Sequence, residues 1–203
     1  TVYAIRDKNE KGATTLSLPT PGRSNLVQQL VTDTRTVNFG GYSTKIRITS
    51  NETITDSKDG WYLDLPTSGE RQVSTPILRG GKIIFTTVIP SGDECSAGGD
   101  SWLMELDALS GSRLDSPPFD LNRDGVFDRD DMVQVDEDDP DSEWINVSGI
   151  GWSDNIVKTP GILSGCPSTN EECKYMSGRS GNVTDVKENA GNQKGRLSWR
   201  EIQ

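Results

Sequence analysis

The chain has 203 residues, with 21 Lys and Arg against 31 Asp and Glu, and therefore a formal net charge of −10. It contains no histidine, which excludes Ser-His-Asp and Cys-His catalysis, histidine-ligated zinc and a histidine pH switch. The acidic balance argues against a protein that binds nucleic acid or anionic lipid by neutralising phosphates. No apolar run reaches the roughly 18 residues that a membrane span needs.

Alternation of polar and apolar residues with a period of two is the main pattern, and it predicts a mainly β fold. The 21 glycines and 10 prolines favour many turns and long loops over long helices. The chain starts directly on a strand pattern without an initiator Met, so we expect it to be the end of something longer. Strands are predicted at residues 2–5, 44–49, 102–109 and 198–202, with a hairpin at 77–89 whose Gly80-Gly81 suits a tight turn.

The segment 24–31 fits two structures. Leu26 and Leu30 stand at the i,i+4 spacing of a helix, as do Val27 and Val31, and Ser24 could cap its N-terminus. The surrounding β-rich sequence favours a strand instead. Both alternatives stay open from the sequence.

Three cysteines, Cys95, Cys166 and Cys173, leave the redox state open. A Cys166–Cys173 disulfide would close a small loop, 166–173, in an exported protein and leave Cys95 unpaired. A bridge from Cys95 to either of the other two is equally allowed by the sequence. Three reduced thiols in a cytosolic protein are the less favoured alternative. No Cys-x-x-Cys pair is present, which argues against structural zinc and thioredoxin chemistry.

Residues 120–131 carry the most specific motif in the chain. Oxygen-bearing side chains stand at loop positions 1, 3, 5 and 9, Gly125 stands at position 6, and a carboxylate stands at position 12. This is the EF-hand calcium-loop pattern with Asp in place of the usual terminal Glu. Ca²⁺ takes six to eight oxygen ligands, and alternate residues of a tight loop direct their oxygens to one centre. The predicted ligands are Asp120, Asn122, Asp124, the carbonyl of Val126 and Asp128, with Asp130 or Asp131 completing the shell.

The residues before this loop exclude an ordinary EF-hand. Pro117-Pro118 stands where the first helix would end, and proline lacks the N–H donor that a helix needs. We therefore expect an isolated calcium loop inserted in a β scaffold, with a structural or locally regulatory role rather than that of a helix-opening sensor.

A second acidic run follows at residues 136–143. It could hold another ion, but a solvated acidic loop is the better interpretation. Residues 120–143 together hold eleven Asp and Glu and two Arg, a local net charge of −9, whereas the rest of the chain has a net charge of −1. The acidity of the protein is thus concentrated in one segment.

Several motifs stand in a fixed order along residues 40–203, and they are Gly60–Pro66, Ser68–Arg71, Phe85–Pro90, Cys95, Ser101–Ala108, Phe119–Gly125 and Gly195–Arg200. This ordered set, with the calcium loop following Phe119, resembles the C-terminal region of the PilY family of type IV pilus tip adhesins and assembly factors.

The resemblance implies that residues 1–203 are the C-terminal part of a modified β-propeller on a bacterial surface, exported through the periplasm, with an adhesive N-terminal domain missing here. It implies association with minor pilins at the pilus tip, and attachment to host or abiotic surfaces through that missing domain. In the family the calcium loop is linked to the balance of pilus extension and retraction, and hence to twitching motility and adhesion. The family's ligand positions correspond to Asp120, Asn122, Asp124, Val126 and Asp128.

The sequence therefore predicts a calcium-dependent pilus factor without enzymatic activity. The alternative is a quinoprotein-dehydrogenase-like propeller enzyme of the periplasm, against which the lack of histidine argues. A secreted dockerin-like module would need a second copy of the loop, and the sequence contains none.

Overall fold

The computed structural model describes residues 1–6, 22–39, 41–92, 98–166, 171–179 and 181–190. Within these ranges the protein is built from strands, turns and two short 3-10 helices, η1 (Arg23–Asn25) and η2 (Arg129–Asp131), and it has no α-helix. The described part accordingly offers no helix that could cross a membrane. The predicted mainly β class is confirmed, whereas the closure of a propeller stays a prediction. The strand predicted at 198–202 lies outside the described residues.

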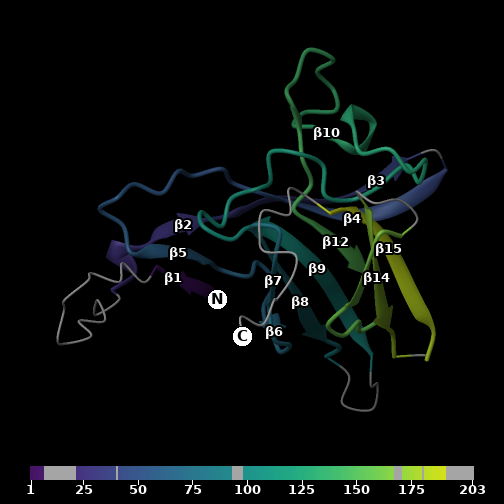
Figure 1. The fold of residues 1–203 in the computed structure, drawn as a ribbon, viewed down its shortest axis with the longest axis horizontal. Helices are drawn as coiled ribbons and strands as arrows, with labels where there is room; N and C mark the ends of the chain where they lie inside the picture. Colours follow the sequence, from purple (N-terminus) through teal and green to yellow (C-terminus); the bar gives the residue numbers. More distant parts are fainter. Residues whose placement is uncertain (7–21, 40, 93–97, 167–170, 180, 191–203) are drawn as a thin grey trace, which may run out of the picture.

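A seven-stranded antiparallel sheet forms the centre of the molecule (Figure 1). Its strands follow the order β3-β4-β12-β9-β8-β6, and β7 pairs with β8 beside β6. The strands are β3 (Val31–Phe39), β4 (Tyr42–Thr49), β6 (Arg71–Gln72), β7 (Ile77–Arg79), β8 (Lys82–Pro90), β9 (Gly99–Asp107) and β12 (Gly149–Trp152).

The hairpin predicted at 77–89 is confirmed as β7 and β8. Arg79 pairs with Lys82, and Gly80 and Gly81 between them have φ angles of +58° and +83°. Residues without a Cβ adopt such angles without strain, which is why the two glycines form this two-residue turn.

The ambiguous segment 24–31 contains a strand, not an α-helix. Strand β2 (Val27–Gln29) follows η1 and runs parallel to β5 (Gly60–Leu63), while β1 (Val2–Ile5) pairs antiparallel on the other edge of β5. The side chain of Gln29 is fully buried, and its amide donates to the backbone carbonyls of Glu52 and Ser110. These distant contacts outweigh the local helical spacing.

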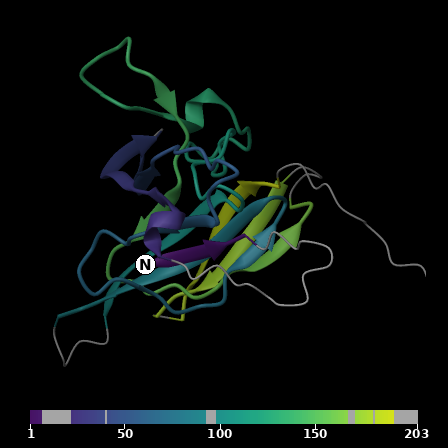
Figure 2. The ribbon, with the colours of Figure 1, turned by 90° about the vertical axis from the view of Figure 1, so that its left-hand side faces the viewer.

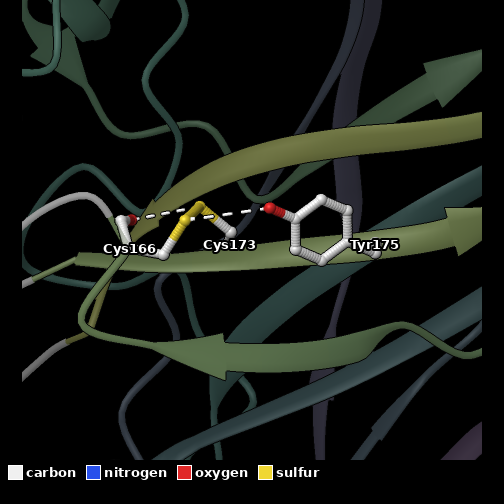
Figure 3. The surroundings of a disulfide bond; sticks show 3 residues. All are labelled: Cys166, Cys173 and Tyr175. Atoms are coloured by element: carbon white, nitrogen blue, oxygen red, sulfur yellow. Dashed lines mark hydrogen bonds between the residues drawn. A yellow bond between two sulfur atoms is a disulfide. The ribbon is translucent and has the colours of Figure 1, made fainter.

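A third sheet, near the end of the described residues, consists of β13 (Gly161–Ser164), β14 (Glu171–Ser177) and β15 (Val183–Asn189). Of the alternatives for the cysteines, the structure has the Cys166–Cys173 disulfide at the turn between β13 and β14 (Figure 3). The Tyr175 hydroxyl lies 3.8 Å from Cys166 Sγ. Cys95 lies outside the described residues.

The central sheet is covered on both faces. In β9, Leu103 faces a core shared with the third sheet, whereas Trp102 and Met104 face a core shared with the β1-β5-β2 sheet. These two smaller sheets lie on opposite sides of β8 and β9 (Figure 1). Burial on both faces explains why β9 reads as an almost continuous apolar run rather than an alternating one.

A buried ionic network joins the third sheet to the central sheet. Glu105 on β9 lies 2.6 Å from Lys174 Nζ on β14 and 2.9 Å from Lys82 Nζ on β8, and Lys174 also forms an ion pair with Glu188 on β15. The side chains of Glu105, Lys174 and Glu188 are fully buried. Burial would raise the pKa of Glu105, but Lys174 and Lys82 outweigh it and hold the pKa below its ordinary value. Burial lowers the pKa of Lys174.

A second buried ion pair lies on the other face of the central sheet. Arg47 on β4 makes a bidentate contact with Glu70, at 2.6 and 2.9 Å, and its guanidinium stacks over the Trp102 ring at 4.0 Å. Glu70 also accepts a hydrogen bond from the Thr87 hydroxyl. A buried charge of this kind is strongly destabilising once its partner is removed, because it is then left without a counter-charge away from water.

We expect Arg47→Met to lower the free energy of unfolding by about 3–5 kcal/mol, because Glu70 is then buried without its counter-charge. The matched control is Lys45→Met, on the same strand and the same face. Lys45 pairs with Asp100 at 3.2 Å, but both side chains are more than one-third exposed, so the loss should stay under about 1 kcal/mol. Urea unfolding at neutral pH measures both, and equal losses would contradict the assignment.

We also expect the loss of unfolding free energy caused by Glu105→Gln to be larger at neutral pH than at acidic pH. The lowered pKa of Glu105 means that its contribution is fully present above about 4.5 and is lost as the pH falls through the folded-state pKa. The difference in unfolding free energy between wild type and variant should therefore shrink on acidification. Glu143→Gln, which changes an exposed carboxylate, should show a small difference at every pH. A difference for Glu105→Gln that stays constant into acid would contradict this account.

Candidate metal centre

The loop 120–131 lies between the third sheet and a short ribbon. On one side Phe119 forms an antiparallel bridge with Glu188 of β15. On the other side η2 leads to β10 (Val133–Gln134), which pairs with β11 (Trp144–Ile145). No α-helix flanks the loop within the described residues, as the prolines at 117 and 118 predict.

The first half of the loop is a series of turns, each closed by a side-chain oxygen. Asp120 Oδ2 accepts from the Gly125 N–H at 3.1 Å, Asn122 Oδ1 accepts from the Asp124 N–H at 2.9 Å, and Asp124 Oδ1 accepts from the Val126 N–H at 2.7 Å. Gly125 has a φ of +80°, the left-handed conformation that favours glycine. The loop positions expected to bind calcium thus also determine the shape of the loop.

The second half is organised by Asp131, the carboxylate at position 12. Asp131 Oδ1 accepts from the N–H groups of Leu121 and Asn122, at 2.6 and 3.3 Å, and its Oδ2 accepts from the Asp128 N–H at 3.4 Å. Asp131 is 1% exposed, whereas Asp130 is exposed to solvent. Of the two acids proposed for the last position, Asp131 is the one that lies inside the loop.

Burial raises the pKa of Asp131 to about 6, although the three backbone donors oppose the rise. The neighbouring Asp120 carboxylate adds to it. Two carboxylates therefore lie close enough to affect each other across the base of the loop.

One oxygen of the loop is left without a hydrogen-bond partner. Asp120 Oδ1 is buried and accepts no hydrogen bond, although Oδ2 of the same carboxylate is bonded to Gly125. A buried carboxylate oxygen without a partner is costly unless a proton, a water or a cation satisfies it. Asp120 also lines a cavity of about 550 Å³ beside β15.

The carboxylates by themselves do not form a metal cluster. Among the residues that the structure describes, no group of three or more Asp, Glu, His or Cys side chains is gathered closely enough to hold an ion. Asp124 and Asp128 are exposed at the rim of the loop, and Asn122 is half-buried. A complete calcium shell would need neutral oxygens as well, from the Asn122 side chain and the Val126 carbonyl.

Two arginines of the loop contact aromatic rings elsewhere in the fold, and sequence reasoning missed both contacts. Arg123 lies over the Tyr42 ring at 4.2 Å, and Arg129 lies over the Trp144 ring at 4.8 Å. Arg123 also has a φ of +64°. The rings lie on β4 and β11, and no local pattern could have paired them with the loop.

The second acidic run, 136–143, forms the tip of a ribbon that projects from the molecule (Figure 2). Its acidic side chains are exposed, and Glu137 pairs with Arg35 at 3.2 Å. Asp136 Oδ1 and Asp139 Oδ1 close local turns by accepting from backbone N–H groups two residues ahead. The geometry is that of a solvated acidic loop.

Comparison with curated proteins finds relatives along the whole chain, although no family model matches it. The chain is 29% identical over 215 residues to the type IV pilus biogenesis factor PilY1 of Pseudomonas aeruginosa strain PAO1, an alignment that covers all of this chain. It is 31% identical over 196 residues, 90% of this chain, to a PilY1 homolog of Xylella fastidiosa. The chain spans only 17% and 14% of the lengths of these two relatives.

The fold also matches a solved structure. The crystal structure of the Pseudomonas aeruginosa PilY1 C-terminal domain superimposes with a TM-score of 0.72 at 23% sequence identity, covering 93% of this chain and 36% of that one. The order of motifs, the similarity along the whole chain and the shared fold lead to one conclusion. The chain belongs to the PilY1 family of type IV pilus biogenesis factors and matches part of the C-terminal domain of that family.

Proposed function

We propose that this chain is a calcium-binding, non-enzymatic part of a type IV pilus biogenesis factor, and that the loop 120–131 is its calcium site. Family membership supports the link to pilus biogenesis. The observation that carries the calcium assignment is the buried Asp120 Oδ1, which has no hydrogen-bond partner inside a loop of calcium-binding pattern.

The residues present fit such an ion. Asp120, Asn122, Asp124 and Asp128 would supply side-chain oxygens, Val126 would supply its carbonyl, and Asp131 would complete the shell. Hard oxygen ligands of this kind are those that Ca²⁺ prefers. When bound, the ion would supply two positive charges to a loop that holds five Asp and two Arg between residues 120 and 131.

The mechanism is electrostatic. Without an ion, the carboxylates of Asp120, Asp124 and Asp128 repel one another, and this repulsion opposes the hydrogen bonds and packing that hold the loop. With an ion the repulsion is removed and the loop closes, which changes the surface that it offers together with the acidic ribbon. Pilus partners, minor pilins among them, would recognise that surface.

In the whole factor, calcium occupancy would tune pilus extension against retraction, and through it twitching motility and surface attachment. The location that follows is the bacterial cell surface at the pilus tip, reached through the periplasm. Contact with host or abiotic surfaces would belong to other regions of such a factor.

Calorimetric titration of the chain with Ca²⁺ tests the site. We expect a dissociation constant at or below the millimolar values that are typical of extracellular calcium modules. Asp124→Ala should weaken binding at least about tenfold, since a charged ligand is lost. Asp138→Ala, which removes a carboxylate from the acidic ribbon, is the matched control and should bind nearly as wild type does. Absence of calcium uptake by the wild type at millimolar concentration would refute the site.

The link to pili can be tested in a bacterium that carries the full-length factor. With Asp124→Ala introduced, we expect a changed balance of surface pili and a changed twitching zone at unchanged protein level. The Asp138→Ala strain should behave as wild type. Normal piliation and twitching in the Asp124→Ala strain would show that calcium binding at this loop does not control pilus dynamics.

A further inference from the structure

The residues that begin the calcium loop are paired with the last strand of the third sheet. Phe119 bridges Glu188, the Asn189 N–H donates to the Pro118 carbonyl at 3.0 Å, and the Asp120 N–H donates to the Lys187 carbonyl at 3.3 Å. The segment 118–120 thus lies along β15 as a short additional strand. The position of Asp120, the first predicted ligand, is set by β15.

Side-chain packing fixes the same segment. Phe119 and Leu121 are buried, at 1% and 4% exposure, and belong to one core cluster with Met176 of β14. Val186 of β15 packs against this cluster. A movement of the third sheet away from the central sheet would therefore disturb the residues on either side of Asp120.

The buried ionic network also contacts the strand that pairs with segment 118–120. Glu188, the residue that faces Phe119 in the bridge, is paired with Lys174, and Lys174 lies 2.6 Å from Glu105 on the central sheet. A chain of buried contacts therefore runs from the calcium loop through β15 and β14 to β9. The network holds the third sheet in the place where segment 118–120 pairs with it.

We propose, resting on the calcium site proposed above, that Ca²⁺ binding and docking of the β13–β15 sheet on the central sheet are coupled. The ion binds best when Asp120 is held beside the other ligands, and Asp120 is held there only while β15 is docked. Because linkage is reciprocal, calcium stabilises the docked sheet by the same free energy by which docking strengthens calcium binding. The Cys166–Cys173 disulfide links the chain just after β13 covalently to β14, so these two strands would move together.

Hydrogen exchange on the unmodified 203-residue chain tests the coupling directly, because amide exchange reports local opening. With Ca²⁺ instead of a chelator, amides of Val183–Asn189 should exchange about tenfold more slowly, which is within the usual range of coupling. Amides of Gly60–Leu63, in the sheet on the opposite side of β8 and β9, are the internal control and should change little. Slowing of exchange confined to residues 120–131 would overturn the proposal.

The reciprocal experiment uses Glu188→Gln, which removes a charge from the network but leaves Lys174 paired with Glu105. We expect its calcium affinity, measured by calorimetry, to fall about tenfold, although Glu188 is not among the proposed ligands. The control is Glu52→Gln, the same chemical change at an exposed position next to the β1-β5-β2 sheet, which should bind calcium nearly as wild type does.

The outcomes separate the two proposals. If the wild type binds no calcium, the proposed site is wrong and the coupling is wrong with it. If the wild type binds calcium but exchange in β15 is unchanged, or Glu188→Gln binds as tightly as wild type, the site stands and the coupling is refuted. Should Glu188→Gln fail to fold, the exchange experiment on the unmodified chain decides alone.

Discussion

The buried ionic network around Glu105 is the constraint on which the arrangement of the layers depends. Its charges come from the central sheet (Glu105 and Lys82) and from the third sheet (Lys174 and Glu188). Charges removed from water are stable only when every partner is in place, so such a network tolerates very few relative positions of the two sheets. Apolar packing alone would allow the sheets to slide. The network therefore fixes the relative position of the two sheets more than it stabilises the fold.

The position of the candidate calcium loop depends on how the third sheet is placed by this network. Its first residue is hydrogen-bonded to β15, and Asp131 at its end gathers backbone donors from both halves of the loop. An ion-binding loop needs its oxygens presented together at little cost in conformational entropy. Here the β scaffold does the work that two flanking helices perform in an EF-hand, which explains how a calcium-type loop can follow two prolines.

Local sequence patterns predicted much of the secondary structure and the turns of the candidate calcium loop. The β1 strand, the β7–β8 hairpin and the turn glycines follow from period-two alternation and from glycine at positive φ. The spacing of oxygens in 120–131 likewise predicted turns that the structure contains. The segment 24–31 resisted prediction, because the contacts of Gln29 that decide it come from residues 52 and 110. The choice between Asp130 and Asp131 also depended on burial, which no spacing reveals.

The sequence alone determined the β class, the concentration of negative charge in residues 120–143, and the family resemblance, because all three reside in residue identity and order. The tertiary structure decided which sheets pack together, which charges are buried as pairs, and that one oxygen of Asp120 is left without a hydrogen-bond partner. The physical reason is distance along the chain. Glu105 and Lys174, or Phe119 and Glu188, lie some 70 residues apart in the sequence, so their interaction exists only after the strands between them have been placed.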